Sequence, residues 1–316
     1  MSSTSRSQLF GDLDVTAQLD APIGAERTWF GIGGKADALV SPQTEEALVT
    51  LIERCAQSST PVRILGKGAN LLVDDDGVDG VVVLLDTPAF SGLKFNREGR
   101  VHRLHAMAGA DLFKTVNELK RQGLAGMEQM AGIPGTIGGG LRMNAGGSYG
   151  CIGDTVDTVR CCSMSGEVLY YERSQLEFSY RKSNLPECIV LSATFNLEPD
   201  DPVAVRSRVS EIWAAKKASQ PMADHSAGCA FRNPLDRDGE RVPAGRLIDE
   251  AGLKGLAEGG ASVSTQHGNF IITDPNATAS HVRRLMRIVQ DRVMDHHGIR
   301  LEPEVVIWER TGITAE

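Results

Sequence analysis

The 316-residue chain lacks several features that mark common classes of protein. Its six cysteines include no C-x-x-C pair and follow no regular spacing, which argues against a disulfide scaffold and against a zinc site. We therefore expect no bound metal and a reducing compartment. No run of about 18 apolar residues occurs, and the opening residues (MSSTSRSQLFGDLD) have no apolar core. These absences predict a cytoplasmic protein with no membrane partner.

Positive charge is also scarce relative to negative charge. The chain has 33 Lys and Arg against 41 Asp and Glu, a formal net charge of −8. An acidic chain is a poor partner for nucleic acid or for an anionic membrane surface, so we expect neither. The hydrophobic content of 41% and the charged content of 23% are ordinary for a globular protein. The length allows one to three domains with a sizeable core.

A dinucleotide-binding fingerprint of the Rossmann type is incomplete in this sequence. Gly66 and Gly68 would supply two of its glycines, but the motif needs a third glycine and must open a helix. Residues 66–85 instead read as strand, turn and strand, with strands at 70–73 and 81–85. A Rossmann domain is therefore disfavoured. A nest of backbone amides that binds a diphosphate, or a simple glycine turn, remains open.

The most unusual stretch of the chain is residues 131–150 (AGIPGTIGGGLRMNAGGSYG), in which eight of twenty residues are glycine. This density argues against an ordinary helix or strand, because each interior glycine costs about 0.5–1 kcal/mol relative to alanine. A loop with positive φ angles, or one that approaches a flat or phosphorylated ligand, fits better. Pro134 restricts the loop, and the large apolar residues Ile133 and Leu141 argue against a flexible linker.

The remaining sequence alternates short strands with amphipathic helices. We expect a loosely held tail over 1–20 and a helix that begins at Ser41-Pro42. Further helices are predicted at 110–122, with a stop at Gly123, at 203–218 and at 244–251, and strands at 62–65, 156–162, 168–171 and 188–195. Thr278 should cap the longest helix, which ends at His296, His297 and Gly298 and carries an apolar face formed by Val282, Leu285, Met286, Val289 and Val293. The two histidines point about 100° apart, so we interpret them as a solvated helix end rather than as metal ligands.

Arg181 and Cys229 both have ordinary structural interpretations when each is considered alone. Arg181 follows Tyr180 in a polar segment, where an arginine is usually a solvated surface residue. Cys229 is a lone cysteine among small residues, and such a cysteine is more often a small buried apolar group than a nucleophile. Neither residue identifies a site by itself.

Seven segments, in this order, resemble the UDP-N-acetylenolpyruvoylglucosamine reductase (MurB) family. They are 30–34 (FGIGG), 66–73 (GKGANLLV), 132–146 (GIPGTIGGGLRMNAG), 180–183 (YRKS), 228–234 (GCAFRNP), 244–255 (AGRLIDEAGLKG) and 301–305 (LEPEV). Each segment is a weak signal, but together they span most of the chain. The stretch 263–270 (VSTQHGNF) resembles the second of the two subtypes of the family.

The resemblance implies an α+β fold. It consists of a two-lobed FAD-binding domain of the vanillyl-alcohol-oxidase (PCMH) type, followed by an α+β substrate-binding domain. On this basis we expect a tail over 1–20, the FAD-binding domain over 21–200, and the carboxy-terminal domain over 201–316. The two lobes of the FAD-binding domain would cover about 21–85 and 86–200, and the last strand of the chain could return to the first lobe.

The resemblance also implies a reaction of peptidoglycan precursor synthesis. NADPH would reduce a non-covalent FAD, which would then reduce the double bond of UDP-N-acetylglucosamine enolpyruvate to give UDP-N-acetylmuramate. The partner is then a UDP-sugar, and we expect a monomer. A flavin oxidase of the same fold is an alternative, although such enzymes often tether flavin through a histidine and none lies in the two glycine-rich loops. A nucleotide-binding regulator without chemistry is a third possibility.

Site residues follow from the resemblance position by position. Arg181 and Glu304 match the pair that stabilises the enolate, with Glu304 protonated or bridging to a donor. Cys229 takes the place of the proton donor, where the family usually has serine. FAD-binding residues would be Gly66, Lys67, Gly68, Ala69, Asn70, Leu71, Gly132, Ile133, Pro134, Gly135, Thr136, Gly138, Asn144 and Gly146. Substrate-binding residues would be Tyr180, Arg181, Lys217, Gly228, Asn233 and His267. The segment Gly147–Gly150 is one residue longer than the common pattern.

Overall fold

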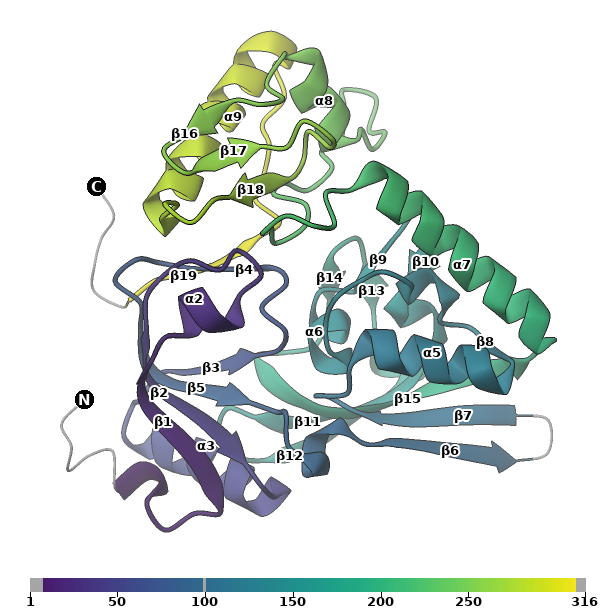
Figure 1. Cartoon of the computed structure of the whole chain (residues 1–316). Coiled ribbons are helices and arrows are strands. Elements are labelled where there is room, and N and C mark those ends of the chain that lie inside the picture. The colour runs from purple at the N-terminus through teal and green to yellow at the C-terminus, as the bar shows by residue number, and fades with distance from the viewer. Residues whose placement is uncertain (1–7, 99–100, 311–316) are drawn as a thin grey trace. The chain divides into compact units, whose positions relative to one another are not determined.

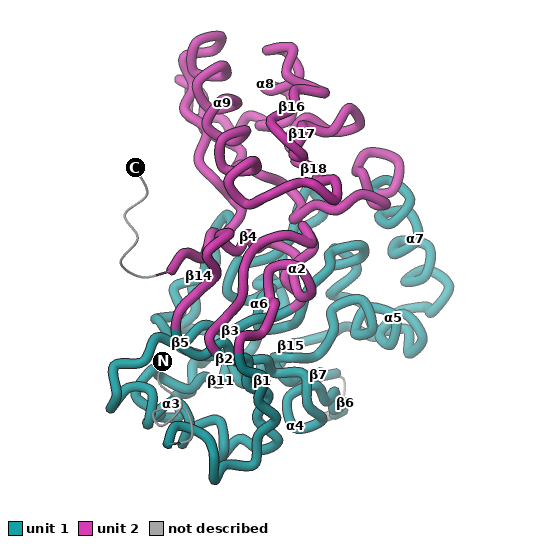
Figure 2. Tube along the Cα trace, turned by 60° about the vertical axis from the view of Figure 1, so that its left-hand side comes forward, with its two compact units in different colours: residues 1–19, 38–66, 80–216 teal, residues 20–37, 67–79, 217–316 magenta. Residues whose placement is uncertain are grey.

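The computed structural model describes residues 8–98 and 101–310 (Figure 1). Two compact units are present, and each is assembled from three separate segments (Figure 2). Unit 1 contains 1–19, 38–66 and 80–216, and unit 2 contains 20–37, 67–79 and 217–316. The sequence predicted functional domains with limits at residues 20 and 200, and these limits stay a prediction. In space, two early segments join the carboxy-terminal residues in unit 2.

Unit 1 is organised around a six-stranded antiparallel sheet with the strand order β12-β11-β15-β7-β6, and β8 pairs with the end of β15. Its strands are β6 (Leu93–Glu98), β7 (Val101–Met107), β8 (Leu124–Ala125), β11 (Val156–Ser163), β12 (Val168–Glu172) and β15 (Cys188–Pro199). These bounds confirm the strands predicted at 156–162, 168–171 and 188–195. The short helix α6 (Ile137–Arg142) packs against β15 and β7 (Figure 1).

Further elements of unit 1 are the longer helices α3, α5 and α7, together with short helices and two-residue strands. They are α3 (Glu45–Gln57), α4 (Pro88–Ser91), α5 (Leu112–Gln122), η1 (Glu128–Met130), β9 (Gly146–Gly147), β10 (Gly150–Cys151), η2 (Ile152–Thr155), η3 (Arg173–Gln175), β13 (Phe178–Ser179), β14 (Lys182–Ser183) and α7 (Pro202–Ser219). Gly123 ends α5 in a left-handed conformation with a φ of 65°, as the sequence predicts.

A second sheet has the strand order β1-β2-β5-β3, with β3 and β5 parallel. Its strands are β1 (Val15–Ala21), β2 (Ala36–Pro42), β3 (Val62–Leu65) and β5 (Val78–Leu84). The strand predicted at 62–65 is confirmed. The loosely held tail predicted over 1–20 is wrong for residues 15–20, which belong to β1, and for Leu9 and Phe10, which are buried. Residues 1–7 lie outside the described part of the chain.

The predicted helix start at Ser41-Pro42 is wrong. Pro42 is the last residue of β2, and α3 begins at Glu45. The hydroxyl of Thr44 caps this helix by accepting a hydrogen bond of 3.1 Å from Ala47 N. A proline can occupy the first turn of a helix or the end of a strand, and here the capping threonine decides where the helix begins.

Unit 2 contains two small sheets and three helices. They are α2 (Ile23–Arg27), β4 (Leu71–Val73), α8 (Ala244–Glu250), β16 (Ala257–Glu258), β17 (Ala261–Val263), β18 (Ile271–Thr273), α9 (Ala279–His297) and β19 (Val306–Trp308). Strands β16, β17 and β18 are antiparallel and α9 packs on β16 and β17, whereas the last strand, β19, runs parallel to β4.

Helix α9 has the cap and the apolar face that the sequence predicts. The hydroxyl of Thr278 accepts a hydrogen bond of 3.2 Å from His281 N, and Gly298 ends the helix in a left-handed conformation. The apolar residues of one face, among them Leu285 and Val289, are buried. The predicted solvated end is correct for His296 only, because His297 is half-buried with Nε2 at 3.0 Å from Leu247 O.

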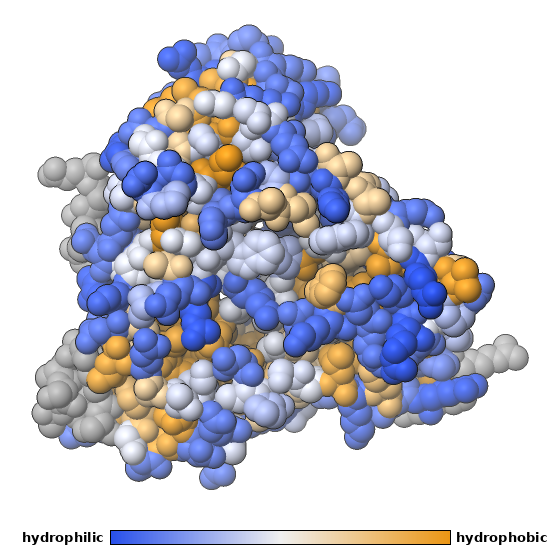
Figure 3. Space-filling model, in the orientation of Figure 1, coloured by the Kyte–Doolittle hydropathy of each residue, from blue (hydrophilic) through white to orange (hydrophobic). Residues whose placement is uncertain are grey.

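Large apolar side chains fill the core of unit 1. Phe195 on β15 lies opposite Leu104 on β7, and both are fully buried. The face seen in Figure 3 is mostly hydrophilic, with hydrophobic residues in small separate groups. The exposed apolar residues include Tyr170, which is 69% exposed on the edge strand β12.

Phe195→Ala should lower the free energy of unfolding by about 3–5 kcal/mol, because it removes buried apolar atoms and leaves a cavity. Tyr170→Ala is the matched control at an exposed aromatic position and should cost little. Urea denaturation followed by circular dichroism measures both. Equal losses for the two variants would contradict the position of the core.

Candidate active site

Within unit 1, Gly66 reaches the glycine-rich stretch at Thr136. A Cβ atom added to Gly66 would lie 3.0 Å from Thr136 Oγ1, and one added to Gly139 would lie 3.4 Å from the same oxygen. Gly66 and Gly139 therefore present backbone, and no side chain, toward the Thr136 hydroxyl. A diphosphate needs such a lining in order to approach backbone N–H groups. These residues of unit 1 fit the diphosphate of FAD.

The prediction that residues 131–150 contain no helix is wrong for residues 137–142, which form α6 (IGGGLR). Thr136 caps this helix by accepting a hydrogen bond from Gly139 N. Gly138 N donates to Ala108 O, and a Cβ atom on Gly138 would lie 3.0 Å from the Ala108 side chain. Close packing on Ala108, directly after β7, therefore explains this glycine, despite the cost in helix propensity.

The entry to the glycine-rich stretch, residues 132–135, is half-buried. Gly132 has a φ of 72°, and its Cβ atom would lie 2.8 Å from Trp213 Cε3, so a glycine is required by the chain itself. Ile133 N donates to Met130 O, and Gly135 O accepts from Leu112 N. The half-buried Pro134 lies between these two hydrogen bonds. The loop is held at both ends, as the sequence predicts for a shaped loop.

In unit 2, the segment 67–71 lies against other parts of the same unit. Gly68 has a φ of 62°, and a Cβ atom there would lie 2.0 Å from Arg27 O. Asn70 Nδ2 donates to Glu304 O at 3.1 Å, and Leu71 begins β4. Lys67 is exposed and Ala69 is half-buried. Gly68 and Asn70 therefore have structural roles within unit 2. The cofactor contacts predicted for residues 67–71 stay a prediction.

Asn144 and Gly146 also have structural roles. The buried Asn144 donates from Nδ2 to Ser179 O at 2.8 Å and accepts at Oδ1 from Gly153 N at 3.1 Å. A Cβ atom on Gly146 would lie 2.4 Å from Gly150 O, so the pairing of β9 with β10 requires glycine. The amide of Asn144 thus orders the segment that leads to Tyr180. Any contact of these two residues with a cofactor stays a prediction.

Tyr180 and Arg181 form the two-residue turn between β13 and β14. Arg181 has a φ of 55°, a left-handed conformation that a long side chain adopts only at a cost. Its guanidinium carbon lies 5.1 Å from the centre of the Tyr180 ring, within the range of a cation–π contact. Both side chains are half-buried. A strained, partly buried arginine is typical of a functional position.

Lys216 on α7 is a half-buried lysine that the sequence did not single out. Its Nζ donates to Ala131 O at 2.6 Å and to Gln129 O at 3.4 Å, directly before the glycine-rich loop. Burial, together with the positive charge of Arg181, lowers the pKa of Lys216 to about 8. The neighbouring Lys217, which was predicted instead, is exposed. A single position on a helix changes the direction of a side chain by about 100°.

Cys229 and Glu304 are brought together in unit 2. Residues 229–232 run between two other segments, with a bridge from Cys229 to Phe270 on one side and from Phe231 to Pro303 on the other. Glu304 N donates to Ala230 O at 2.8 Å. Cys229 and Glu304 are both half-buried. Arg181, the third residue of the predicted catalytic set, belongs to unit 1.

A buried amide holds this arrangement. Asn269, which is 2% exposed, donates from Nδ2 to Phe231 O at 2.8 Å and accepts at Oδ1 from Phe231 N at 2.9 Å. His267 Nδ1 accepts from Asn269 N at 3.2 Å, so the neutral histidine supports the asparagine. Burial, and the charge of Lys254, lower the pKa of His267. The substrate contact predicted for His267 stays a prediction.

Gly228 and Asn233 flank the segment that carries Cys229. Gly228 has a φ of 77°, and no atom lies within 4 Å of the position that a Cβ atom would take. The left-handed conformation, rather than crowding, therefore requires glycine there, and space is left beside Cys229. Asn233 Oδ1 accepts from Ala244 N at 2.9 Å, at the start of α8.

Over 8–98 and 101–310, no group of three or more His, Cys, Asp and Glu side chains could hold a metal ion. In the same ranges, every helix is too short or too polar to cross a bilayer.

Two protein-family models match the chain. Residues 36–171 match an FAD-binding domain, and residues 220–308 match the carboxy-terminal domain of UDP-N-acetylenolpyruvoylglucosamine reductase. The chain is similar to the reductase of that name from Desulfosudis oleivorans, with 40% identity over 91% of this chain and 93% of the relative. It is 37% identical to the reductase from Listeria innocua over 93% of this chain and 95% of that one.

A solved structure supports the same assignment. The reductase from Thermus caldophilus matches with a TM-score of 0.76 and 36% identity, over 93% of this chain and 99% of that one. The α+β fold predicted from the resemblance, an FAD-binding domain followed by a second α+β domain, is confirmed. The relatives support the reductase rather than an oxidase of the same fold. The chain belongs to the UDP-N-acetylenolpyruvoylglucosamine reductase family.

Proposed function

We propose that this chain reduces UDP-N-acetylglucosamine enolpyruvate to UDP-N-acetylmuramate, with NADPH as the reductant and FAD as a non-covalent cofactor. The reaction would belong to peptidoglycan precursor synthesis in the cytoplasm. Relatives that carry the name of this reductase align over nearly the whole chain. The observation that carries the proposal is the pairing of residues 229–232 with the Glu304 segment, which puts a thiol and a carboxyl group on adjacent backbone.

FAD would be held by the glycine-rich residues that were predicted from the sequence. When bound, it accepts a hydride from NADPH and delivers a hydride to the enolpyruvyl double bond. The two loops at 66–71 and 132–146 contain no histidine or cysteine, so they offer no side chain of the kind that usually tethers a flavin. The backbone around Thr136 would hold the diphosphate, because side chains are missing at Gly66 and Gly139.

Arg181 would bind the carboxylate of the substrate. Hydride addition to the terminal carbon builds negative charge on the neighbouring carbon and its carboxylate, and a fixed cation stabilises that charge. The planar guanidinium suits a carboxylate because it can donate two parallel hydrogen bonds. The left-handed turn and the Tyr180 ring hold the side chain of Arg181 in place. Glu304, when protonated, would donate a further hydrogen bond to the enolate.

Arg181→Lys should slow the reduction of the enolpyruvyl sugar by about 100-fold or more, because lysine keeps the charge but loses the planar fork. Flavin reduction by NADPH should stay close to the wild-type rate. Glu304→Gln should show the same division between the two half-reactions. Stopped-flow absorbance of the flavin measures each half separately, and equal damage to both halves would refute the assigned roles.

Cys229 would supply the proton that completes the reaction. Its S–H bond breaks as the proton passes to the carbon that carries the carboxylate, and the resulting thiolate then takes a proton from solvent. A thiol is a stronger acid than the serine hydroxyl that is usual in the family. The open position beside Gly228 leaves room for substrate next to the sulfur.

Cys229→Ser should keep substantial activity, whereas Cys229→Ala should lose about 100-fold or more in the second half-reaction, as is typical for a general acid. A reagent that alkylates thiols should inactivate the wild type but not the serine variant, and substrate should protect the wild type. Cys55→Ser is the control for modification elsewhere, since Cys55 is buried. Near-normal substrate reduction by Cys229→Ala would remove the residue from the mechanism.

Lys216 would add positive charge near Arg181 for an anionic group of the substrate. Its pKa of about 8 in the folded chain lies below the ordinary value of 10.5. Between these values the unfolded chain binds the proton more tightly, so the contribution of Lys216 to stability rises as the pH rises from about 8 to 10.5. Below pH 8 the ammonium group is charged in both states, and the cost of burying it is fully present.

The free energy of unfolding of the wild type, relative to Lys216→Met, should therefore increase between pH 8 and pH 10. Lys217→Met is the matched control, because Lys217 is an exposed neighbour and should show no such change. Urea denaturation at several pH values gives the comparison. The same pH dependence in all three proteins would show that Lys216 is not buried as described.

A further inference from the structure

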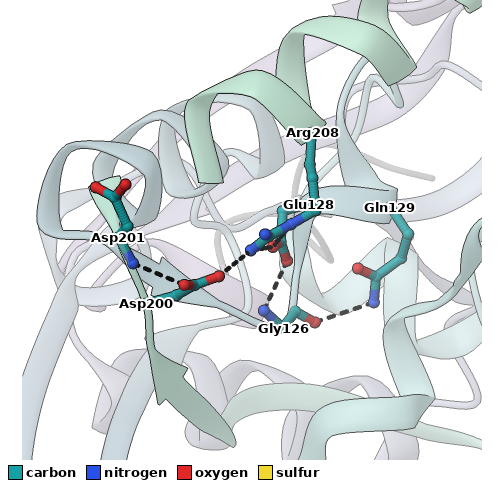
Figure 4. A network of polar contacts seen from close by, with 6 residues as sticks. All are labelled: Gly126, Glu128, Gln129, Asp200, Asp201 and Arg208. Carbon is teal, nitrogen blue, oxygen red and sulfur yellow. Dashed lines mark hydrogen bonds and ion pairs between the residues drawn. The ribbon is translucent and has the colours of Figure 1, made fainter. Parts of the chain in front are cut away.

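The turn that leads into the glycine-rich stretch, residues 126–131, carries a nearly buried carboxylate (Figure 4). The side chain of Glu128 is 12% exposed. Its Oε2 accepts from Gly126 N at 2.7 Å, and its Oε1 accepts from Arg208 Nε at 2.9 Å and from Arg208 Nη2 at 2.7 Å. A buried carboxylate is stable only when it is paired and hydrogen-bonded in this way. Glu128 thus joins its own turn to helix α7.

Helix α7 is attached to the same turn at a second point. Lys216 donates to Ala131 O and Gln129 O, eight residues after Arg208, which corresponds to about 12 Å along the helix axis. The two attachments fix both ends of the segment 128–131. The next residue, Gly132, begins the loop.

Other contacts hold the turn independently of Arg208. Met127 and Met130 are 1% and 0% exposed. Gln129 Nε2 donates to Gly126 O (Figure 4) and also to Cys151 O. Loss of Arg208 should therefore leave the turn folded but release one side of it. Asp200 also accepts from Arg208 Nη2, at 2.7 Å, but its side chain is 39% exposed. An exposed ion pair of this kind contributes little.

We propose that Arg208 and Glu128 are positioning residues for the flavin site. Through Gly126 N and the turn, they set the path of the backbone into Gly132–Thr136, the loop that would lie along FAD. The inference rests on the proposed function for the place of the flavin. Arg208, which is 42% exposed, donates two charge-assisted hydrogen bonds to Oε1 of the nearly buried Glu128, and these bonds fix the geometry of the contact. Arg208 acts through Glu128 and is not itself a ligand of the flavin.

The first test is the affinity of the apoprotein for FAD, followed by quenching of flavin fluorescence. Arg208→Gln should raise the Kd by about tenfold, and Glu128→Gln by a similar factor, because either change removes a charge-assisted pair. Arg208→Lys keeps the charge and one donor, and should recover part of the affinity. Two matched controls should stay near the wild-type value: Asp200→Asn, which removes only the exposed partner, and Arg206→Gln, which removes an exposed arginine of the same helix.

The second test needs no flavin. Amide hydrogen exchange of the apoprotein should become faster at residues 126–132 in Arg208→Gln, with little change in the strands of the central sheet. A lower melting temperature with an unchanged Kd for FAD would overturn the proposal, since it would show a merely structural contact. Unchanged exchange at 126–132 would overturn it as well. Wild-type protein that binds no FAD would instead refute the proposed function and, with it, the flavin part of this inference.

Discussion

The side-chain amide of Asn269 fixes the segment on which the proposed chemistry of unit 2 depends. It binds both backbone groups of Phe231 and is almost inaccessible to solvent. An unpaired amide would be costly at that depth, so the pairing selects one alignment of residues 229–232 between their two neighbours. Cys229 and Glu304 then lie on adjacent backbone. His267 supports the asparagine, which links a residue expected to touch substrate to the framework of the site.

In unit 1, the buried side-chain amide of Asn144 has a similar structural role. The amide of Asn144 holds Ser179 O and Gly153 N, and it thereby fixes the turn that presents Tyr180 and Arg181. Asn144 and Arg181 both have positive φ angles, so strain accumulates next to the proposed substrate carboxylate site. The glycines nearby have a complementary role, because Gly132 and Gly138 allow close packing beneath the loop. Buried amides and glycines thus position the polar side chains that would perform the reaction.

The sequence predicted those features that depend on local rules. The Thr278 cap, the apolar face of α9 and the Gly123 stop follow from local chemistry and were predicted correctly. The helix inside the glycine-rich stretch was missed, because tertiary packing on Ala108 overrides propensity there. The half-buried position of Lys216 beside Ala131 O was not predicted, because it depends on the rotation of α7, and the substrate contact predicted for Lys217 stays a prediction. Arg208, the ion-pair partner of Glu128, lies 80 residues away in the chain and leaves no local signal.

The visible absorption spectrum of the purified protein tests the central claim most directly. The account predicts an oxidised flavin spectrum that NADPH bleaches without oxygen and that UDP-N-acetylglucosamine enolpyruvate restores in proportion to the amount added. Acid precipitation should leave the colour in the supernatant, since no covalent bond is expected. A colourless protein that does not take up FAD would contradict the account. So would a bleached flavin that only oxygen, and not the sugar nucleotide, returns to the oxidised state.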